Sequence, residues 1–571
     1  MVDLQAKPFN LDDEGVKWVQ DTISSMSIDE KIGQLFFNLT ASRDEAHLKE
    51  IVTKYHIGGA RYNNAGAKEI HAQNKILQEN SKIPLIIAAN TEAGGNGACS
   101  DGTMIGDHVK IGATDNPENA YEFGRMANKE AQAIGCNVCF APICDINLNW
   151  RNPIISNRCF SNDADTVAKM SVEYMKGAMA NGNFACTAKH FPGDGLDERD
   201  QHLAPSINSY DTDRWMNTYG KVYTALIEAG LPSIMAGHIM LPSWEKELNP
   251  SITEEEMMPA TLSKPLLTGL LREKLGFNGM IVTDASHMVG LTCMMKRKDM
   301  LPAAIAAGCD MFLFFNDLDE DFGYMKDGYT NGIITDERLH DALQRILALK
   351  ASMGLHKVSK DCRITPAENI EKIVGCEEHK NFAKKMADES ITLIKNKQNI
   401  FPLTPEKYKR IMIVPVGGAG SAGLFALMGK GGKPAEETLK AILEAKGFEV
   451  SIFEDPIAKI QQDVLDAQYE AKRTNNPDLA KQVMGKGVNV YMAAKSAVKD
   501  FVGKQDLIIT LGKVKSYGSV VERVHWGMGK GGGQIPWYVH ELPVVVASVG
   551  HPFLLPDVPF AKTYINCYDS G

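Results

Sequence analysis

The feature that most constrains the fold of this chain is an alternation of apolar, strand-like runs with helical patterns from about residue 20 to residue 355. Most of the runs are almost continuously apolar, which is typical of strands in a parallel sheet that is covered on both faces. We predict strands at residues 56–63, 84–90, 136–142, 184–190, 232–238, 279–285 and 309–315. Helical patterns lie between them, at residues 117–134, 162–181, 213–230, 263–275 and 335–353. Repeated strand–helix units over this length favour a (β/α)8 TIM-type barrel over an open sheet.

Changes of pattern mark both ends of this unit. In "SIDEKIGQLFF", Ser27 can cap a helix and Glu30 stands at the capping-box position, so we predict that a helix begins there. Beyond the barrel, a charged, irregular stretch is followed by a second alternation of strands and helices. The predicted domains are a barrel at 1–355, a linker at 356–375 and an α/β/α sandwich at 376–571. Because the sequence stops at Gly571, where a further helix is expected, we expect the second domain to be truncated there.

Charge and targeting signals narrow the partners of the chain. The formal net charge of -10 gives an overall field that repels phosphate backbones and anionic membranes, so neither nucleic acid nor a membrane is an expected partner. The first residues have no basic stretch followed by an apolar one, and no run of about 18 apolar residues occurs later. We therefore predict a cytoplasmic protein that acts on a small molecule, and nothing in the sequence indicates its oligomeric state.

Two features suggest a cofactor or metal, but neither has the required spacing. Cys136 and Cys139 form a C-x-x-C pair, but no second pair follows at zinc-site spacing. Several of the 11 cysteines lie in apolar segments, as reduced thiols would. Gly418, Gly420 and Gly423 follow a strand, but their spacing is not that of a dinucleotide-binding loop. We expect no cofactor and no metal.

Polar side chains follow several of the predicted barrel strands. Reactive groups of such barrels gather at the carboxyl ends of the strands, because the loops there converge on one cavity. The polar residues at these ends are Asn90, Glu92, Asp145, Asn147, Lys189, His190, His238 and Asp284, with Arg158 in the loop after Asp145 and Asn147. A set of polar groups on consecutive strand–helix units predicts a polar ring that lines one site.

Asp284 and the pair Asp200–His202 are the strongest catalytic candidates. Asp284 ends an apolar strand, so it either caps the next helix or acts at the cavity rim as a nucleophile or electrostatic stabiliser. Asp200 and His202 are two residues apart, which puts both on one side of an extended stretch. There Asp200 can orient the imidazole and raise its pKa, so His202 is predicted to carry a proton, unless the stretch is only a solvated loop.

The stretch "AKHFPGDGLDERDQHLAP" resembles the long loop of glycoside hydrolase family 3, in its β-N-acetylhexosaminidase branch, where K-H-F-P-G-H-G is followed after four residues by D-x-H. "MSIDEKIGQLF", "FAPICDINLNWRNPIISNRCF", "IMAGHIMLP", "FNGMIVTDA" and "ESITLIKN" resemble further blocks of that family in the same order. The resemblance implies a barrel followed by an α/β sandwich. It implies that Asp284 is the nucleophile, His202 the general acid/base and Asp200 its partner. Sugar hydroxyls would be bound by Arg158, Lys189 and His190, and we add Asn90 and His238 from the same ring.

These residues predict a retaining, exo-acting β-N-acetylglucosaminidase that works through a covalent glycosyl-enzyme intermediate. A retaining glycosidase needs a carboxylate that attacks the anomeric carbon and a proton donor that later serves as base toward water. A histidine is suited to both tasks near neutral pH. Because a deprotonated histidine is neutral, it does not repel an incoming phosphate, so phosphate is a second possible acceptor.

The sequence departs from the family pattern in two places. Where the branch reads D-Q-E-G-G-R, this chain has "NTEAGGNGA", so Asn90 stands at the position of an aspartate and the arginine is missing. Asp194 replaces the middle histidine of F-P-G-H-G and adds a carboxylate that we expect to raise the pKa of His202. The first departure leaves the sugar selectivity open.

Three alternatives therefore stay open. The first is a β-glucosidase or a glycoside phosphorylase on the same scaffold. The second is a noncatalytic sugar-binding protein. The third is a metal-dependent barrel hydrolase that uses His190, His202 and His238 as ligands.

Overall fold

The computed structural model describes residues 2–417, 434–453, 456–476, 478, 498–514, 521–524 and 536–569 of the chain. The chain divides into two compact units, of which the first contains Met1–Ser390 and the second begins at Ile391. The stretch with Gly418, Gly420 and Gly423 and the last residue, Gly571, lie outside the described residues, as do the predictions that concern them. In the described part, no helix combines the length and the apolar character that crossing a membrane requires.

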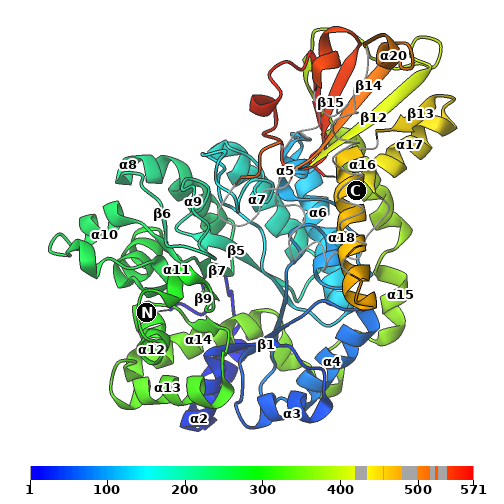
Figure 1. Ribbon diagram of the computed structural model, residues 1–571. Helices are drawn as coiled ribbons and strands as arrows, with labels where there is room; N and C mark the ends of the chain where they lie inside the picture. Colours follow the sequence, from blue (N-terminus) through cyan, green and yellow to red (C-terminus); the bar gives the residue numbers. More distant parts are fainter. Residues whose placement is uncertain are drawn as a thin grey trace. The chain divides into compact units, whose positions relative to one another are not determined.

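The first unit is built on a closed barrel of parallel strands, as predicted (Figure 1). The strands are β1 (Phe36–Thr40), β2 (Gly59–Tyr62), β3 (Ile86–Ala89), β4 (Val138–Cys139), β5 (Ala185–Phe191), β7 (Ser233–Ala236), β9 (Met280–Ala285) and β10 (Met311–Leu313). They are hydrogen-bonded in this order, and β10 pairs with β1 to close the ring. The sequence predicts all of these strands except β1.

Strand β1 was missed because its residues continue the apolar stripe of the preceding helix. Ser27 and Glu30 form the predicted capping box, but helix α2 (Ile28–Gln34) ends after seven residues. Phe36–Thr40 are extended instead, since they pair with β2 on one side and with β10 on the other. Tertiary pairing thus decides the conformation of a segment whose local pattern is ambiguous.

The register of the strands decides which side chains face the inside of the barrel. Phe37 of β1 and Phe140, just beyond β4, have ring centroids 5.7 Å apart although these two strands are not neighbours. Rings from strands on different sides of the barrel meet in this way across its interior. Paired residues of neighbouring strands lie on the same face of a sheet, and the face repeats every second residue. Followed around the ring, the pairs give an interior set that includes Gly59, Arg61, Ala88, Val138, Ala185, Thr187, Lys189, Ser233, Met235, Val282 and Asp284.

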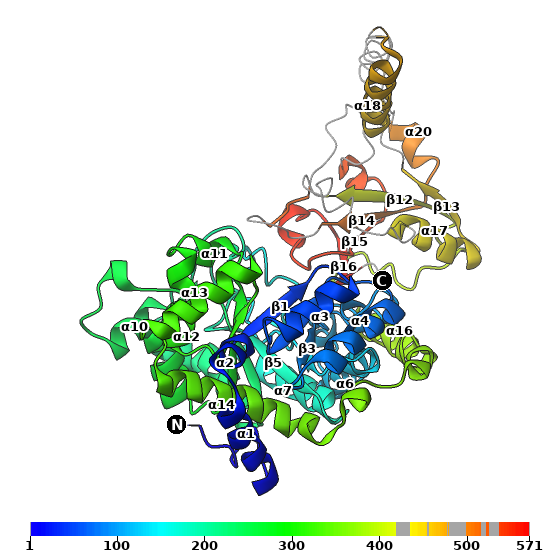
Figure 2. The same cartoon turned by 90° about the horizontal axis from the view of Figure 1, so that it is seen from below.

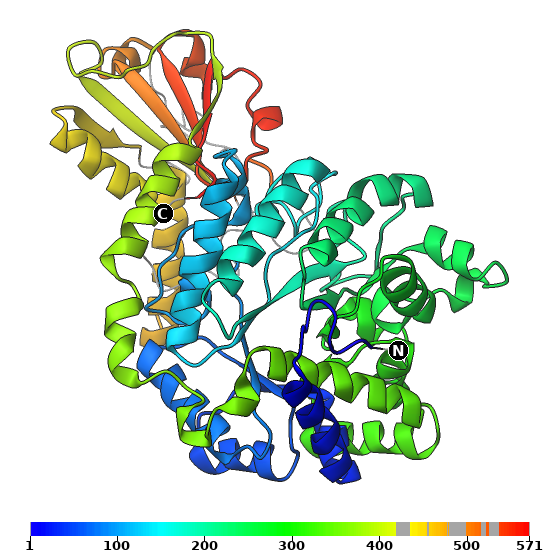
Figure 3. The same ribbon diagram turned by 180° about the vertical axis from the view of Figure 1, so that it is seen from behind.

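Helices surround the barrel, and Figure 2 shows α3, α4, α6 and α7 outside strands β1, β3 and β5. The helices of this unit, besides α2, are α1 (Asp13–Ser25), α3 (Glu45–Thr53), α4 (Ala67–Asn80), α5 (His108–Gly112), α6 (Pro117–Ala133), α7 (Ala164–Met179), α8 (Thr212–Trp215), α9 (Lys221–Glu228), α10 (Pro242–Leu248), α11 (Val289–Thr292), α12 (Arg297–Ala307), α13 (Leu318–Thr330), α14 (Asp336–Ser352), α15 (Ile370–Ile373) and α16 (Glu377–Ser390). A π-type helical segment spans Pro265–Lys274, and the short strands β6 (Ser206–Ile207) and β8 (Ile239–Met240) pair in parallel. Helix α1 packs against α14, as Figure 3 shows from behind.

The segment 356–375, predicted as a linker, packs on the barrel helices within the first unit. Arg363 donates to the carbonyl oxygens of Gln78 and Ser81 at the end of α4, and the imidazole Nε2 of His71 lies 2.7 Å from the carbonyl oxygen of Thr365. Helix α16 also belongs to this unit, because its buried His379 bonds to Glu130 of α6. The composition of the sequence, from which the linker 356–375 was predicted, gives no sign of these contacts.

The second unit contains a six-stranded sheet, which confirms the predicted C-terminal sheet domain. Its strands are, in sheet order, β11 (Thr392–Asn396), β16 (Thr563–Asn566), β15 (Val544–Ser548), β14 (Leu507–Lys513), β12 (Arg410–Gly417) and β13 (Glu449–Ile452), with only β11 antiparallel to its neighbour. Apolar clusters cover both faces of the sheet. Alternation sends Val414 to one cluster and Ile413 to the other. The helices are α17 (Ala435–Ala445), α18 (Pro456–Thr474) and α20 (Val498–Val502).

A buried carboxylate fastens the amino ends of β9 and β10. Asp310 is fully buried just before β10, and its Oδ2 accepts hydrogen bonds from the guanidinium of Arg272 at 2.8 Å and from the backbone N–H of Ile281 at 2.7 Å. Its other oxygen accepts from Arg338. One carboxylate therefore holds two guanidinium groups beneath the barrel, of which Arg338 also pairs with Asp341.

We expect Asp310→Asn to destabilise the first unit by about 3–5 kcal/mol, because it leaves two buried guanidinium groups without their shared anion. Asp319→Asn is the matched control, since this carboxylate is exposed and pairs with Lys54, so its loss is expected to cost at most about 1 kcal/mol. Urea unfolding followed by circular dichroism measures both. Equal, small losses in the two variants would contradict the importance of Asp310.

Candidate active site

The carboxyl ends of the barrel strands bring the predicted site residues together. Lys189 ends the interior face of β5 and Asp284 that of β9. Asn90 directly follows β3, two residues after the interior-facing Ala88. These side chains therefore lie at the same end of one closed ring, as the sequence predicts.

Asp145 fixes the orientation of His190 from beneath. Asp145 is completely buried after β4, and its Oδ2 accepts a 2.7 Å hydrogen bond from Nδ1 of His190. Its Oδ1 accepts from the backbone N–H groups of His190 and Asp194, at 3.1 and 2.8 Å. With Nδ1 engaged, Nε2 of His190 is directed toward the site and lies 3.9 Å from Oδ2 of Asp284.

Glu92 joins two of the predicted sugar-binding cations. The guanidinium of Arg158 donates two hydrogen bonds to its carboxylate, at 3.1 and 3.2 Å, and the ammonium of Lys189 donates a further one. Burial raises the pKa of Glu92, but the charges of Arg158 and Lys189 outweigh this effect and hold the pKa well below its usual range. Glu92 is thus an anion that orients Arg158 and Lys189. The sequence analysis places Glu92 at a strand end but does not predict that it orients Arg158 and Lys189.

Asp284 is held as an anion at the rim of the barrel. The backbone N–H of Ala285 donates to its Oδ1 at 2.7 Å. Burial raises the pKa of Asp284, but the interactions with His190 and His238 outweigh burial, so the pKa lies below its usual value. The side chain is 13% exposed, which leaves its second oxygen open to the site.

His238 was predicted to bind substrate, but its ring is fully engaged in the wall of the barrel. Nε2 lies 3.0 Å from the carbonyl oxygen of Ala285, and Nδ1 lies 2.8 Å from the hydroxyl of Thr261. Burial lowers its pKa, so Nε2 of the neutral ring donates to Ala285 and Nδ1 accepts from Thr261. Neither nitrogen is left for a sugar hydroxyl, and His238 instead supports the end of β9.

Asp200 and His202 form the predicted pair. Nδ1 of His202 donates to Oδ1 of Asp200 at 2.6 Å, which leaves Nε2 available for proton transfer. Burial lowers the pKa of His202, but the hydrogen bond and charge of Asp200, followed by the charge of Asp284, raise it above its usual value. The side chain of His202 is 43% exposed, so substrate can reach it.

Backbone hydrogen bonds tie the loop of His202 to α11, the helix that follows β9. The N–H of Val289 donates to the carbonyl oxygen of His202 at 3.1 Å, and that of Gly290 donates to Gln201 at 3.0 Å. The side chain of Gln201 accepts from the backbone N–H of His238 at 2.8 Å. The loop therefore holds the imidazole beside the strand end that carries Asp284.

Asp194, which replaces a histidine of the family pattern, lies buried under this loop. It accepts hydrogen bonds from Asn152 at 2.8 Å and from Gln201 at 3.4 Å. Burial, and next the charge of Asp145, raise the pKa of Asp194 to about 7. Asp194 thus links the wall of the barrel to the loop that carries His202.

Two residues of the ring have unsatisfied polar groups. Oδ1 of Asn90 is buried and accepts no hydrogen bond within the described part of the chain. The guanidinium of Arg61, on the interior face of β2, likewise has no hydrogen-bond partner in the described residues. The sequence analysis did not single out Arg61, although an arginine inside the apolar run "HIGGARYN" could have indicated it. Both groups are therefore available to a ligand.

A metal centre from His190, His202 and His238 would require new side-chain positions, because both nitrogens of His238 are engaged. Elsewhere in the described residues, Cys376, Glu378 and His379 offer ligand atoms within 4.8 Å of one another. Glu378 pairs with Arg125, and His379 bonds to Glu130.

The thiol of Cys136 lies 3.0 Å from the hydroxyl of Tyr62, and that of Cys139 lies 3.4 Å from Cys186, so the C-x-x-C thiols have separate partners.

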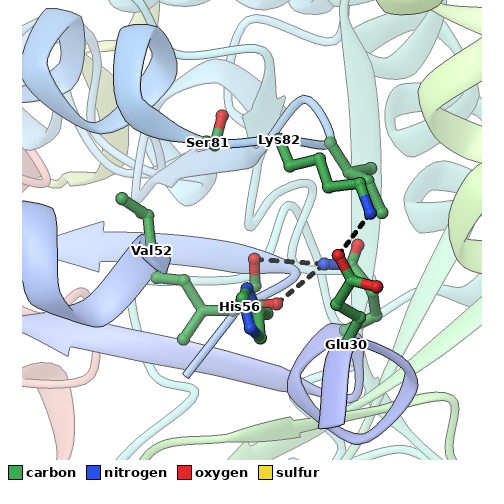
Figure 4. Close-up of a pocket in the computed structure, with 8 residues that line it drawn as sticks. Glu30, Val52, His56, Ser81 and Lys82 are labelled. Carbon is green, nitrogen blue, oxygen red and sulfur yellow. Dashed lines mark hydrogen bonds and ion pairs between the residues drawn. The ribbon is translucent and has the colours of Figure 1, made fainter. Parts of the chain in front are cut away.

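The pocket drawn in Figure 4 lies at the opposite end of the barrel. Its lining includes Ile57 and Ile83, which precede β2 and β3, and the ion pair between Glu30 and Lys82. None of its lining residues belongs to the ring at the carboxyl ends of the strands.

The ring can hold a polar ligand and transfer a proton to it. It presents the Asp284 carboxylate, the imidazole pair of His202 and Asp200, and the oriented donors of Arg158, Lys189 and His190. An anionic carboxylate next to a proton carrier is the set of groups that displacement at an acetal carbon requires.

Comparison with known proteins identifies the family of the chain. Residues 27–349 match the model of the glycosyl hydrolase family 3 N-terminal domain. A Cellulomonas fimi protein described as a β-N-acetylglucosaminidase/β-glucosidase is 38% identical over 574 residues, which cover 100% of this chain and 94% of the relative. A solved β-glucoside phosphorylase bound to 2FGlc has 35% identity and a TM-score of 0.86, with 100% of this chain and 94% of the other covered. A Paenibacillus β-N-acetylglucosaminidase, at 22% identity and a TM-score of 0.72 over 96% of this chain and 94% of its own, shares the fold. The chain therefore belongs to glycosyl hydrolase family 3.

Proposed function

We propose that this protein is a retaining, exo-acting β-N-acetylglucosaminidase that removes terminal β-linked N-acetylglucosamine from small glycosides. In this proposal Asp284 attacks the anomeric carbon and forms a covalent glycosyl-enzyme intermediate. The observation that carries the proposal is that an ionised carboxylate and a proton-carrying imidazole face the same mouth of the barrel. Asp284 has a lowered pKa and is therefore ionised. The loop bonded to α11 holds the His202–Asp200 pair near enough for the charge of Asp284 to act on His202.

The first step joins the sugar to the enzyme. As the bond between the anomeric carbon and Asp284 forms, the bond to the leaving oxygen breaks, and His202 donates its Nε2 proton to that oxygen. Asp200 holds the opposite nitrogen and stabilises the protonated ring, so the proton is in place when substrate arrives.

The second step releases the sugar. His202, now neutral, accepts a proton from a water molecule that attacks the anomeric carbon, and the electron pair of the ester bond returns to Asp284. Two inversions at the same carbon retain the β configuration.

The remaining ring residues are suited to bind the sugar. Lys189 and Arg158 are oriented by Glu92, and His190 is oriented by Asp145, so their donors are fixed before substrate binds. The buried Oδ1 of Asn90 lacks a donor within the described residues, and a sugar hydroxyl would supply one.

A β-glucoside is the second candidate substrate, with phosphate as an alternative to water. The 35% identical neighbour is a β-glucoside phosphorylase, and the 38% identical relative is described with both sugars. The loss of the family's aspartate at Asn90 also leaves the selectivity open. Comparison of kcat/KM for an aryl N-acetylglucosaminide and an aryl glucoside decides which sugar is preferred.

We expect Asp284→Asn to lower turnover of the preferred aryl glycoside on the order of 10⁴-fold, because the amide cannot form the glycosyl ester. Asp299→Asn, which removes an exposed carboxylate from the following helix α12, is the matched control and should keep normal turnover. Initial rates of aglycone release measure both. Near-normal turnover of Asp284→Asn would exclude it as the nucleophile.

We expect the effect of His202→Ala to depend on the leaving group. For an alkyl or sugar aglycone, loss of the proton donor should slow cleavage by about 10²–10⁴-fold. For a dinitrophenyl aglycone, which leaves without a proton, the first step should be almost unaffected. Pre-steady-state release of the aglycone measures this step, and an equal loss for both aglycones would rule out the acid role.

We expect the pH profile of kcat/KM to depend on Asp200. Activity is lost as pH rises through the pKa of His202, which Asp200 and Asp284 raise, and as pH falls through the lowered pKa of Asp284. Asp200→Asn removes the main cause of the raised value, so the alkaline limb should move to lower pH. Glu198→Gln removes an exposed charge from the same loop and should leave the limb in place. An unmoved limb in Asp200→Asn would contradict this assignment.

A further inference from the structure

Arg61 is a cation inside the barrel for which the substrate chemistry above has no use. It pairs in register with Leu39 of β1 and lies two residues after Gly59, which pairs with Phe37. Because Phe37 faces the interior, Arg61 faces it as well, one step closer to the carboxyl end. It therefore stands on the same inner wall as Lys189 and Asp284, at the level of the active site.

Within the part of the chain that the structure describes, Arg61 makes no hydrogen bond or ion pair. The other two cations of the ring are already engaged, since Arg158 and Lys189 both bond to the carboxylate of Glu92. Arg61 is only partly exposed, and burial lowers the pKa of its guanidinium. A partly buried guanidinium without an anion is costly, so its five donors are suited to a charged ligand.

The space next to Arg61 is the mouth of the active site. Tyr62 and Glu92 act on the charge of Arg61. Arg61 in turn acts on the imidazole of His287, which follows β9, together with Asp284, His202 and Arg297. An anion bound by Arg61 therefore lies in the same inner mouth of the barrel as the reacting groups.

We propose that Arg61 is the residue that binds inorganic phosphate as an acceptor in competition with water, so that phosphate can release the sugar from the glycosyl-enzyme. The proposal rests on the proposed function, because it requires the intermediate on Asp284. A guanidinium matches phosphate oxygens with two parallel donors. The acid/base His202 is neutral after the first step, so it does not repel an anion as a carboxylate would.

The step balances without an added reagent. An unprotonated oxygen of HPO₄²⁻ attacks the anomeric carbon and forms the new C–O bond. The ester bond to Asp284 breaks, and its electron pair returns to the carboxylate. The products are the sugar 1-phosphate monoanion, which keeps the proton of HPO₄²⁻, and the free anionic enzyme. No general base is needed, so His202 can remain neutral.

The test isolates this step by starting from the trapped intermediate. The full-length enzyme is loaded with an activated fluorosugar that matches its preferred substrate, a 5-fluoro N-acetylglucosaminide or a 2-fluoro glucoside. Excess reagent is removed, and recovery of activity is followed at increasing inorganic phosphate. We expect phosphate to accelerate recovery and to yield the fluorosugar 1-phosphate. In Arg61→Gln, the phosphate concentration for half-maximal recovery should rise by about 10–100-fold, as loss of a charged hydrogen-bond pair predicts.

Two further variants make the result specific. Arg151→Gln removes an exposed guanidinium in the loop after β4, where it lies near Glu198, and should leave the phosphate dependence unchanged. Arg61→Lys keeps the charge and should recover part of the affinity if Arg61→Gln is well folded, which circular dichroism checks. If Arg61→Gln and wild type respond to phosphate alike, or if phosphate does not accelerate wild-type recovery, the proposal is wrong.

Other outcomes identify other causes. If no intermediate can be trapped, the proposed function fails, and the role of Arg61 as an acceptor site fails with it. If the intermediate forms but Arg61→Gln instead lowers kcat/KM only for substrates with a carboxylate, such as an aryl glucuronide, then the anion belongs to the substrate and phosphate binding is excluded.

Discussion

Closure of the parallel barrel is the constraint on which the rest of the molecule depends. Once β10 pairs with β1, every second residue of each strand must face one small interior, and the carboxyl ends of all strands must meet around one mouth. Side chains alternate between the two faces of each strand. This alternation packs Phe37 against Phe140 inside the barrel, and it places Arg61, Lys189 and Asp284 at the mouth. The polar ring is therefore a consequence of register.

Electrostatics then divides the ring into parts with different tasks. Glu92 bonds to both Arg158 and Lys189 and fixes them as donors, and Asp145 fixes His190. These groups are engaged before any ligand arrives, so they lose little freedom on binding. Asp284, His202 and Arg61 keep an atom open to the mouth of the barrel. On our proposals they attack the sugar, carry the proton and hold the acceptor.

The sequence predicts well what depends on local pattern. Continuous apolar runs located the strands that carry Asn90, Lys189 and Asp284, and the spacing of Asp200 and His202 indicated their hydrogen bond. It predicts poorly what depends on distant partners. Strand β1 needs its neighbours to be extended, and the role of Glu92 appears only when Arg158 arrives from 66 residues away. For the same reason His238 was expected to bind sugar, although Thr261 and Ala285 occupy both of its nitrogens.

The identity of the residue that becomes bonded to the sugar is the most direct test of this account. The enzyme is loaded with a fluorosugar that matches its preferred substrate, a 5-fluoro N-acetylglucosaminide or a 2-fluoro glucoside, and is then digested with a protease. The peptide that gains the mass of the fluorosugar is sequenced by tandem mass spectrometry. We predict that the label lies on Asp284, in the peptide that contains "GMIVTDASHM". A label on another carboxylate, or rapid turnover with inverted configuration and no labelled peptide, would contradict the account.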